Sequence, residues 1–351
     1  MAESLAAIAR KLNVAPSTIS RALSNPELVA PKTREKILNY VQEIGYQPNL
    51  AARSLRRQRT NIVGIVVNDL SDSLIAQSAS IMQDLAFERG FFPVLLATED
   101  DPQKEKEALA QLKTINICGL VIIPTCQSAA TLNSLHVPIV ELDRSSGCNC
   151  FDEFRMDDQA AMQMACNHLA GLGCKHLAVL LGNVDVVSSF RSRFQALQSC
   201  APQAHYSHFF MQAISAHELT ASARTLTHAL LHPTADNLAA TKNILLSSSS
   251  NPDLSSLPPL DGIICTNHSL ATGVVQGFFD CKQPLNQDIK LLTFDHPDWL
   301  QVLPQKIAAL TNPLEQAAQL AMERLLDRLE GRYTSNVEAR LLRPVLHPAE
   351  I

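Results

Sequence analysis

Apolar residues near the start of the chain recur at the spacing of one helix face. Leu5, Ile8, Ala9 and Leu12 follow the i, i+3, i+4, i+7 pattern, and Ser4 stands where an N-cap is needed. The pattern therefore predicts a first short amphipathic helix.

Two further helices follow within the next 35 residues. Asn13 can adopt the left-handed conformation that ends the first helix, and Pro16 suits the first turn of a second. The pair Asn25–Pro26 stops that helix, and a third begins near Pro31 and ends before Gly45. The expected inward residues are Ile19, Leu23, Ile37, Leu38, Val41 and Ile44. Two short helices with a tight turn, braced by a third, predict a helix-turn-helix head.

From residue 61 onward, short apolar runs alternate with helical patterns. The β-branched run Ile62–Val67 is typical of a strand buried on both faces. Further strands are expected at 92–97, 119–124, 137–142, 176–181, 207–211, 261–266 and 289–294, and helices at 73–89, 101–114, 158–172, 187–197 and 269–279. This alternation predicts parallel sheets with helices on both faces. Two such sets indicate two lobes with a ligand cleft between them.

The charge is divided unevenly along the 351 residues. The whole chain carries a formal charge of -5, yet residues 1–60 hold ten basic residues against four Glu, a charge of +6. Four of the arginines crowd the run NLAARSLRRQR at 49–59. A basic head on an acidic body indicates a polyanion-binding segment.

Other classes of protein find little support. No apolar run reaches the ~18 residues that span a bilayer, and the N-terminus does not resemble a secretory signal, so we expect a cytoplasmic protein with no membrane partner. Nucleotide-binding, serine-hydrolase and zinc-protease motifs are absent, so we expect no enzyme, cofactor or metal. Most of the nine cysteines lie in apolar runs, which suits reduced core thiols. A metal or redox role stays open for the lone C-x-C pair Cys148 and Cys150.

The second predicted helix has a polar outward side formed by Ser17, Thr18, Ser20 and Arg21. In a helix-turn-helix this helix enters the major groove, where hydroxyls and arginine bond bases or phosphates. From the pattern alone, a three-helix bundle with a solvated polar face is the alternative.

The head resembles that of the bacterial lactose-repressor (LacI/GalR) family. The similarity includes VAPSTISRAL, V-x-x-K-T-R-E-K at Val29–Lys36 and Y-x-P-N-x-x-A-R-x-L at Tyr46–Leu55. It implies a hinge helix that folds on operator DNA, with Leu55 wedged between base steps of the minor groove and Ala52 at close contact. The DNA-binding residues so implied are Ser4, Pro16, Ser17, Thr18, Ser20, Arg21, Thr33, Asn49, Ala52, Arg53, Leu55 and Arg56.

The remainder resembles the family's sugar-binding core, which is shared with periplasmic binding proteins. The implied organisation is a head at 1–47, a hinge at 48–60 and an effector-binding and dimerisation core at 61–351. The first lobe would take about 61–155 and 312–333, and the second about 156–311 and 334–351. The Ser/Pro-rich segment within 232–260 is expected to be a surface loop.

Polar residues that follow predicted strands are the candidate effector ligands, because open α/β sheets bind ligands at the carboxyl ends of their strands. They are Asp69, Asp72, Asp143, Ser189, Arg191, Arg193, Asn267 and Asp295. By resemblance, Arg193, Asn267 and Asp295 match family motifs. The chain departs from the family at Asp72 and at His268, which replaces the usual acidic residue.

These observations predict a DNA-binding transcription regulator, a repressor of carbohydrate metabolism genes that binds a pseudo-palindromic operator as a dimer or tetramer. A sugar or sugar phosphate would control it, and some stretches resemble the family's fructose/sucrose branch. The alternatives are a periplasmic-type sugar-binding protein without a DNA-reading role, and an enzyme. Whether the effector is an inducer or a corepressor stays open.

Overall fold

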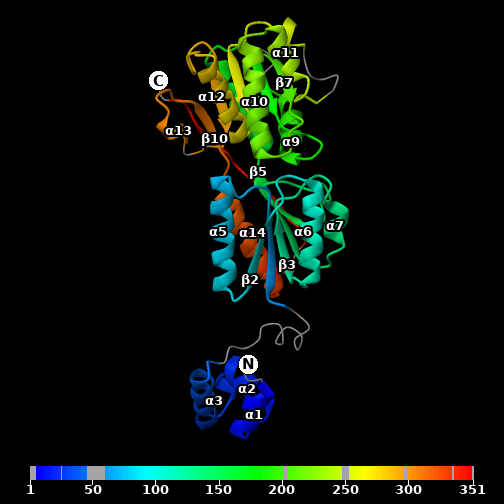
Figure 1. Ribbon diagram of the computed structural model, residues 1–351, viewed down its shortest axis with the longest axis vertical. Helices are drawn as coiled ribbons and strands as arrows, with labels where there is room; N and C mark the ends of the chain where they lie inside the picture. Colours follow the sequence, from blue (N-terminus) through cyan, green and yellow to red (C-terminus); the bar gives the residue numbers. More distant parts are fainter. Residues whose placement is uncertain are drawn as a thin grey trace. The chain divides into compact units, whose positions relative to one another are not determined.

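The computed structural model describes residues 5–24, 26–45, 60–200, 204–246, 253–295, 297, 299–333 and 336–349. The chain forms two compact units, residues 1–60 and 61–351 (Figure 1). Among the described residues, no helix is long and apolar enough to cross a membrane. The predicted hinge up to residue 59 and six candidate DNA ligands lie outside the described residues: Ser4, Asn49, Ala52, Arg53, Leu55 and Arg56.

The first unit is the predicted helix-turn-helix. Its elements are α1 (Leu5–Leu12), α2 (Pro16–Ser24), the 3-10 turn η1 (Pro26–Leu28) and α3 (Pro31–Glu43). Asn13 has a φ of 53°, so it makes the left-handed turn between α1 and α2. Ile8, Ile19 and Ile37 are fully buried at the centre. Leu38 was expected inside but is 38% exposed, because it lies one residue, about 100° of helix, from Ile37.

The first lobe of the second unit contains a six-stranded parallel sheet in the order β11-β5-β4-β3-β1-β2. Its strands are β1 (Ile62–Val67), β2 (Phe92–Ala97), β3 (Gly119–Ile122), β4 (Ile139–Leu142), β5 (Asp152–Met156) and β11 (Ala339–Leu342). Helices α5 (Ser73–Glu88) and α14 (Leu314–Leu329) cover one face, and α6 (Pro102–Thr114) and α7 (Ala129–Asn133) the other.

The second lobe contains another six-stranded sheet, in the order β12-β10-β9-β8-β6-β7, in which only β12 runs antiparallel to its neighbour among the described strands. Its strands are β6 (His176–Leu181), β7 (His205–Phe210), β8 (Gly262–Cys265), β9 (Lys290–Phe294), β10 (Ala308–Thr311) and β12 (Val345–His347). Its helices are α8 (Asp158–Gly171), α9 (Ser188–Leu197), α10 (Ala216–Leu231), α11 (Ala235–Thr241), α12 (His268–Asp280), α13 (Trp299–Val302) and the 3-10 turn η2 (Leu254–Ser256).

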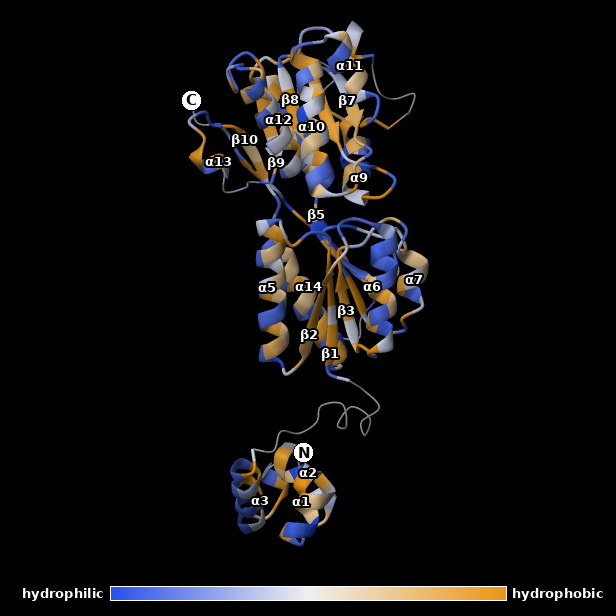
Figure 2. Ribbon diagram, in the orientation of Figure 1, coloured by the Kyte–Doolittle hydropathy of each residue, from blue (hydrophilic) through white to orange (hydrophobic). Residues whose placement is uncertain are grey.

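Figure 2 shows the reason for this layering, because the strands of both lobes are largely apolar while their helices alternate apolar and polar faces. The strands are buried between helices on both sides, as parallel sheets require. The predicted fold class, a helical head followed by two parallel-sheet lobes, is confirmed.

The structure corrects two expected boundaries. Residues 334–351 were assigned wholly to the second lobe, but β11 pairs in register with β5 of the first lobe, Ala339 opposite Glu153. Of the two strands within 334–351, only β12 belongs to the second sheet, because the chain crosses from the first lobe to the second after β11. Within 232–260, α11 and a bridge between Met211 and Leu245 replace part of the expected loop.

Candidate functional site

A pocket lies between the two lobes, with about 590 Å³ of space not occupied by atoms, open solvent included. The polar residues of the first lobe and its crossover that line it are Asn68, Asp69, Asp72, Asp100, Asp143, Arg144 and Asn312. Those from the second lobe are Ser189, Arg193, Asn267, His268, Ser269 and Asp295. Most of them follow the carboxyl end of a strand, where open α/β sheets place their ligands.

Seven of the eight candidate effector ligands line this cavity, and Arg191 does not. Its side chain is 45% exposed, and its Nε donates a hydrogen bond to the carbonyl oxygen of Val184 at 2.9 Å. Arg191 and Arg193 are two residues apart on α9, about 200° around the helix, so they point in different directions. Arg191 therefore does not line the cavity with the others, and its role in effector binding stays a prediction.

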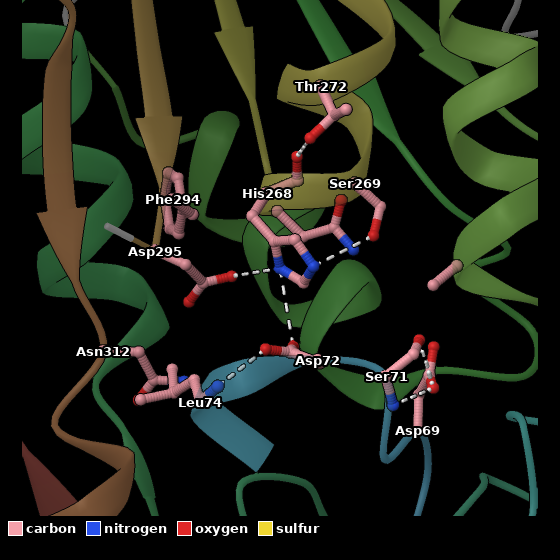
Figure 3. A network of polar contacts seen from close by, with 12 residues as sticks. Asp69, Ser71, Asp72, Leu74, His268, Ser269, Thr272, Phe294, Asp295 and Asn312 are labelled. Atoms are coloured by element: carbon pink, nitrogen blue, oxygen red, sulfur yellow. Dashed lines mark hydrogen bonds and ion pairs between the residues drawn. The ribbon is translucent and has the colours of Figure 1, made fainter. Parts of the chain in front are cut away.

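Two of the polar residues also cap helices. Asp72 Oδ1 accepts a hydrogen bond from Leu74 N at 2.9 Å at the start of α5. Asn267 Oδ1 accepts one from Leu270 N at 2.9 Å at the start of α12. Each cap uses one side-chain oxygen and holds the side chain at the cavity edge. The second oxygen of Asp72 stays directed at the opposite lobe (Figure 3).

Arg193 is 4% exposed and firmly held. Its Nε donates to Asp158 Oδ1 at 2.8 Å, and its Nη1 donates to the carbonyl oxygen of Thr266. The guanidinium also lies 4.7 Å from the ring centre of Phe294. A buried charge needs such a partner, and these contacts hold the guanidinium of Arg193 in place in the cavity lining.

Arg144 is the corresponding arginine of the first lobe. Its Nη2 lies 3.3 Å from Asp100 Oδ2, and its Nε lies 3.6 Å from Asp143 Oδ2. Burial works to lower the pKa of Arg144, but the charges of Asp100 and Asp143 outweigh it and raise the pKa. Asp143 also accepts a hydrogen bond from Asn312 Nδ2 at 2.9 Å, which ties the strand end to the crossover before α14.

His268 joins the two lobes at the edge of the cavity (Figure 3). Its Nδ1 lies 3.5 Å from Asp72 Oδ2 in the first lobe and 3.6 Å from Asp295 Oδ2 in the second. Its Nε2 lies 3.2 Å from Ser269 Oγ. The imidazole therefore stands between two candidate effector ligands, in contact with both carboxylates.

The pKa values at this bridge reflect burial and charge. Burial lowers the pKa of His268, but the interactions with Asp295, Asp72 and Asp69 outweigh it, so the pKa is raised. Burial raises the pKa of Asp72, against the opposing charge of His268. Burial would raise the pKa of Asp295, but His268 and Arg193 lower it. The pair consequently favours a charged imidazole beside the Asp295 carboxylate.

Two buried polar atoms in the cavity lack a hydrogen bond. They are Asn68 Oδ1 and Arg144 Nε, which have no hydrogen-bond partner among the described residues. Buried polar atoms are nearly always paired, so these two point to hydrogen bonds made with a ligand or water. The space between the lobes is thus suited to a hydroxylated molecule.

Several other residues that line the cavity also follow strand ends, although they were not among the candidates predicted from the sequence. Asn68 directly follows β1 and Asp100 lies shortly after β2, at the carboxyl ends where the other candidates were sought. His268 was noted only as a departure from the family. Asn312 follows β10, a strand that the pattern did not predict.

The described candidate DNA ligands of the head lie on or beside α2 and α3. Pro16 and Arg21 are exposed, and the partly buried ones are Ser17, Thr18, Ser20 and Thr33. Their contacts with DNA remain predictions.

The C-x-C pair is joined by a disulfide between Cys148 and Cys150. Among the described residues, no cluster of three or more His, Cys, Asp or Glu side chains could hold a metal ion.

A helix-turn-helix head and a two-lobed core with a ligand cavity define a ligand-responsive DNA-binding protein. Residues 4–49 match the family described as bacterial regulatory proteins, lacI family, and residues 166–348 match the periplasmic binding protein-like domain. The chain belongs to the lacI family of bacterial regulatory proteins, and the protein is a DNA-binding transcription regulator.

Individual relatives agree with this assignment. The ribose operon repressor of Halalkalibacterium halodurans is 25% identical over 327 residues, covering 93% of this chain and 90% of that protein. The Lac repressor dimer bound to operator and the anti-inducer ONPF has a TM-score of 0.75 at 20% identity, covering 99% of this chain and 98% of that one. The Cra regulator of Pseudomonas putida in complex with fructose 1-phosphate has a TM-score of 0.67 at 17% identity, covering 84% and 100%. At these identities the two structures show the fold alone.

Proposed function

We propose that this protein represses carbohydrate genes by binding a pseudo-palindromic operator as a homodimer or tetramer, and that a small sugar or sugar phosphate controls it. The observation that carries the proposal is the cavity between the lobes, which is lined by seven of the polar residues predicted from the sequence, drawn from both lobes. Carboxylates there accept hydrogen bonds from hydroxyls, and the held arginines donate them. The ribose repressor and the sugar-phosphate complex of Cra support this ligand class.

The effector acts by changing the relative stability of two arrangements of the lobes. A ligand that contacts Asp72 and Asn312 on one side and Arg193 and Asp295 on the other stabilises the arrangement in which all four reach it. It shifts the equilibrium only as far as its affinities for the two arrangements differ. We infer that this shift reaches the DNA through residues 48–60 and the head.

The direct test is selection of duplexes from a random pool with the full-length protein, followed by binding of the selected duplex in the presence of sugars and sugar phosphates. A palindromic sequence whose binding responds to one compound is expected. If no sequence is enriched at moderate salt, the head does not read DNA as proposed, and the core must be tested as a binding protein or an enzyme.

We further propose that the protein acts by binding alone, in the cytoplasm, where bacterial operator DNA lies. The basic head, with its charge of +6 over residues 1–60, favours this reading over a sugar-binding protein with no DNA-reading role. Turnover of any sugar by the purified protein would contradict it.

A further inference from the structure

The connection between β4 and β5, residues 143–151, is short and has no helix or strand of its own. Parallel strands are ordinarily joined by a crossover of a dozen or more residues, most often a helix. This loop begins at the cavity between the lobes, because Asp143 and Arg144 belong to the cavity lining. A change in the 143–151 loop therefore reaches the cavity through its first two residues.

Side chains accept the hydrogen bonds of the amides in the middle of this loop. Ser145 N donates to Ser188 Oγ at 3.0 Å, and Ser146 N donates to Glu141 Oε2 at 3.2 Å. Gly147 N donates to Ser145 Oγ at 3.0 Å. The first of these bonds links the two lobes, since Ser188 begins α9. The loop is thus held by a few side-chain contacts, one of which comes from the second lobe.

A disulfide between Cys148 and Cys150 fastens the second half of the loop. It lies against the end of α7, where Asn133 Nδ2 is 3.5 Å from Cys148 Sγ and Asn133 Oδ1 is 3.6 Å from Cys150 Sγ. Asn149, between the two cysteines, has a φ of 54°, in the left-handed region that asparagine tolerates. Closing this short ring removes conformations that the reduced loop would otherwise adopt.

The disulfide is accessible from solvent. Cys150 is exposed and Cys148 is half-buried, whereas the other seven cysteines, all of them in the described part of the chain, are buried or half-buried and form no disulfide. Exchange with a thiol requires that a thiolate reaches one of the two sulfur atoms, and exposed disulfides are the labile ones. The position of this bond therefore suits a reversible site.

We propose that Cys148 and Cys150 form a reversible redox site, and that its reduction by a dithiol loosens the 143–151 loop and the contact of this loop with the second lobe. A thiolate of the dithiol attacks Sγ of Cys150, the disulfide bond breaks, and Cys148 leaves as a thiolate. The second thiolate of the dithiol attacks the dithiol's own sulfur in the mixed disulfide, so that Cys150 leaves and the dithiol departs as a disulfide. Two electrons pass to the protein. The two protons that the dithiol loses to water balance the two that the cysteines take up.

Reduction acts on the loop without unfolding the lobe. Because the ring is opened, the loop samples more conformations, and the side-chain contacts of Ser145, Ser146 and Gly147 break more often. The bond from Ser145 to Ser188 is among them, so the redox state changes how firmly the lobes are joined at this point. The inference goes beyond the proposed function, since it requires neither an operator nor a sugar.

The disulfide itself is tested on the full-length protein. Purified without reductant, denatured and alkylated, the protein should carry seven labels by mass spectrometry, and nine when the folded protein is first treated with excess dithiothreitol. Peptide mapping should place the two additional labels on Cys148 and Cys150. Nine labels without reductant, or a disulfide that excess dithiothreitol leaves intact in the folded protein, would overturn the proposal.

Hydrogen exchange measures the effect on the loop. The amides of Ser145, Ser146 and Gly147 should exchange roughly tenfold faster in the reduced protein than in the oxidised protein, because local opening is no longer restrained by the ring. The amides within β4 and β5 should exchange equally in both states. Equal exchange of the loop amides in the two states would exclude a switch.

Variants identify the atoms responsible. The protein with both Cys148→Ser and Cys150→Ser should exchange like the reduced wild type, with or without dithiothreitol. Cys281→Ser, at a half-buried cysteine that forms no disulfide, is the matched control and should keep the full response. A response that survives in the double variant, or is lost in the control, would contradict the assignment. Ser188→Ala should speed exchange of the Ser145 amide in the oxidised protein, and unchanged exchange there would exclude the link to the second lobe.

Discussion

Nδ1 of His268 lies 3.5 Å from Oδ2 of Asp72, although the two residues belong to different lobes. The imidazole of His268 therefore occupies one edge of the cavity between the lobes. A ligand that bonds Asp72 must share that carboxylate with the imidazole or displace it. We therefore expect the protonation of His268 to influence both the contact between the lobes and the binding of an effector.

Replacement of His268 by Asn should remove a pH-dependent part of the stability. Because the folded-state pKa of His268 is raised above the ordinary value of about 6.5, the charged contact stabilises fully below about pH 6.5 and is lost as the pH rises through the folded-state pKa. Chemical denaturation between pH 5.5 and 9 should show a higher unfolding free energy for the wild type than for the variant, with a difference that shrinks as the pH rises. His136→Asn, at an exposed position whose φ of 53° Asn tolerates, is the control. A stability difference between wild type and His268→Asn that increased with pH would contradict a charged contact between His268 and Asp72.

Replacement of Glu141 by Gln should have the opposite pH dependence. Burial raises the pKa of Glu141 to about 7, with Glu153 on the neighbouring strand adding to the effect and hydrogen bonds from Ser146 opposing it. The folded state thus binds a proton that the unfolded state releases near pH 4.5, and stability falls as the pH rises from 4.5 to 7. Above pH 7 the variant should gain up to about 3 kcal/mol in unfolding free energy. The exposed Glu88→Gln should show no such gain, and a flat wild-type profile would refute the prediction.

Replacement of Arg193 by Lys should impair the effector response while leaving effector-free DNA binding intact. Lysine retains a positive charge beside Asp158. It lacks the planar guanidinium group, which bonds the carbonyl oxygen of Thr266 and lines the cavity. We expect at least roughly tenfold weaker effector binding, measured by calorimetry and by release from or recruitment to the operator. Arg191→Lys, outside the cavity lining, should behave like the wild type. Normal regulation in Arg193→Lys would remove Arg193 from the site.

Replacement of Leu55 by Ala should weaken specific operator binding more than non-specific binding. An apolar wedge offsets the cost of unstacking only where the duplex is bent into the specific complex. We expect a loss of roughly tenfold or more for the operator and little change for random duplex, compared at equal salt by fluorescence anisotropy. Leu38→Ala, on the half-exposed side of α3, is the control within the head. Equal losses on both duplexes would exclude a wedge.

The strands that the pattern predicted are those with an apolar run, whether they lie inside a sheet or at its edge. β1, β2 and β6 begin and end as expected; β1 and β6 are buried inside their sheets, whereas β2 is an edge strand. β5 and β11 were missed because they contain charged residues, as in DEFRM and ARLL. The charges of β5 are tolerated because Asp152 pairs with Arg324 and Arg328 of α14, a long-range arrangement with no local pattern.

The sequence by itself determined the helix-turn-helix head, the two α/β lobes and most of the cavity, because hydrophobic period, turn residues and strand ends are local properties. Only the tertiary structure decided which lobe takes β11, which of the neighbouring arginines 191 and 193 enters the cavity, and that His268 meets Asp72 across it. These relationships depend on main-chain pairing and packing between segments far apart in the chain, and no local pattern contains that information.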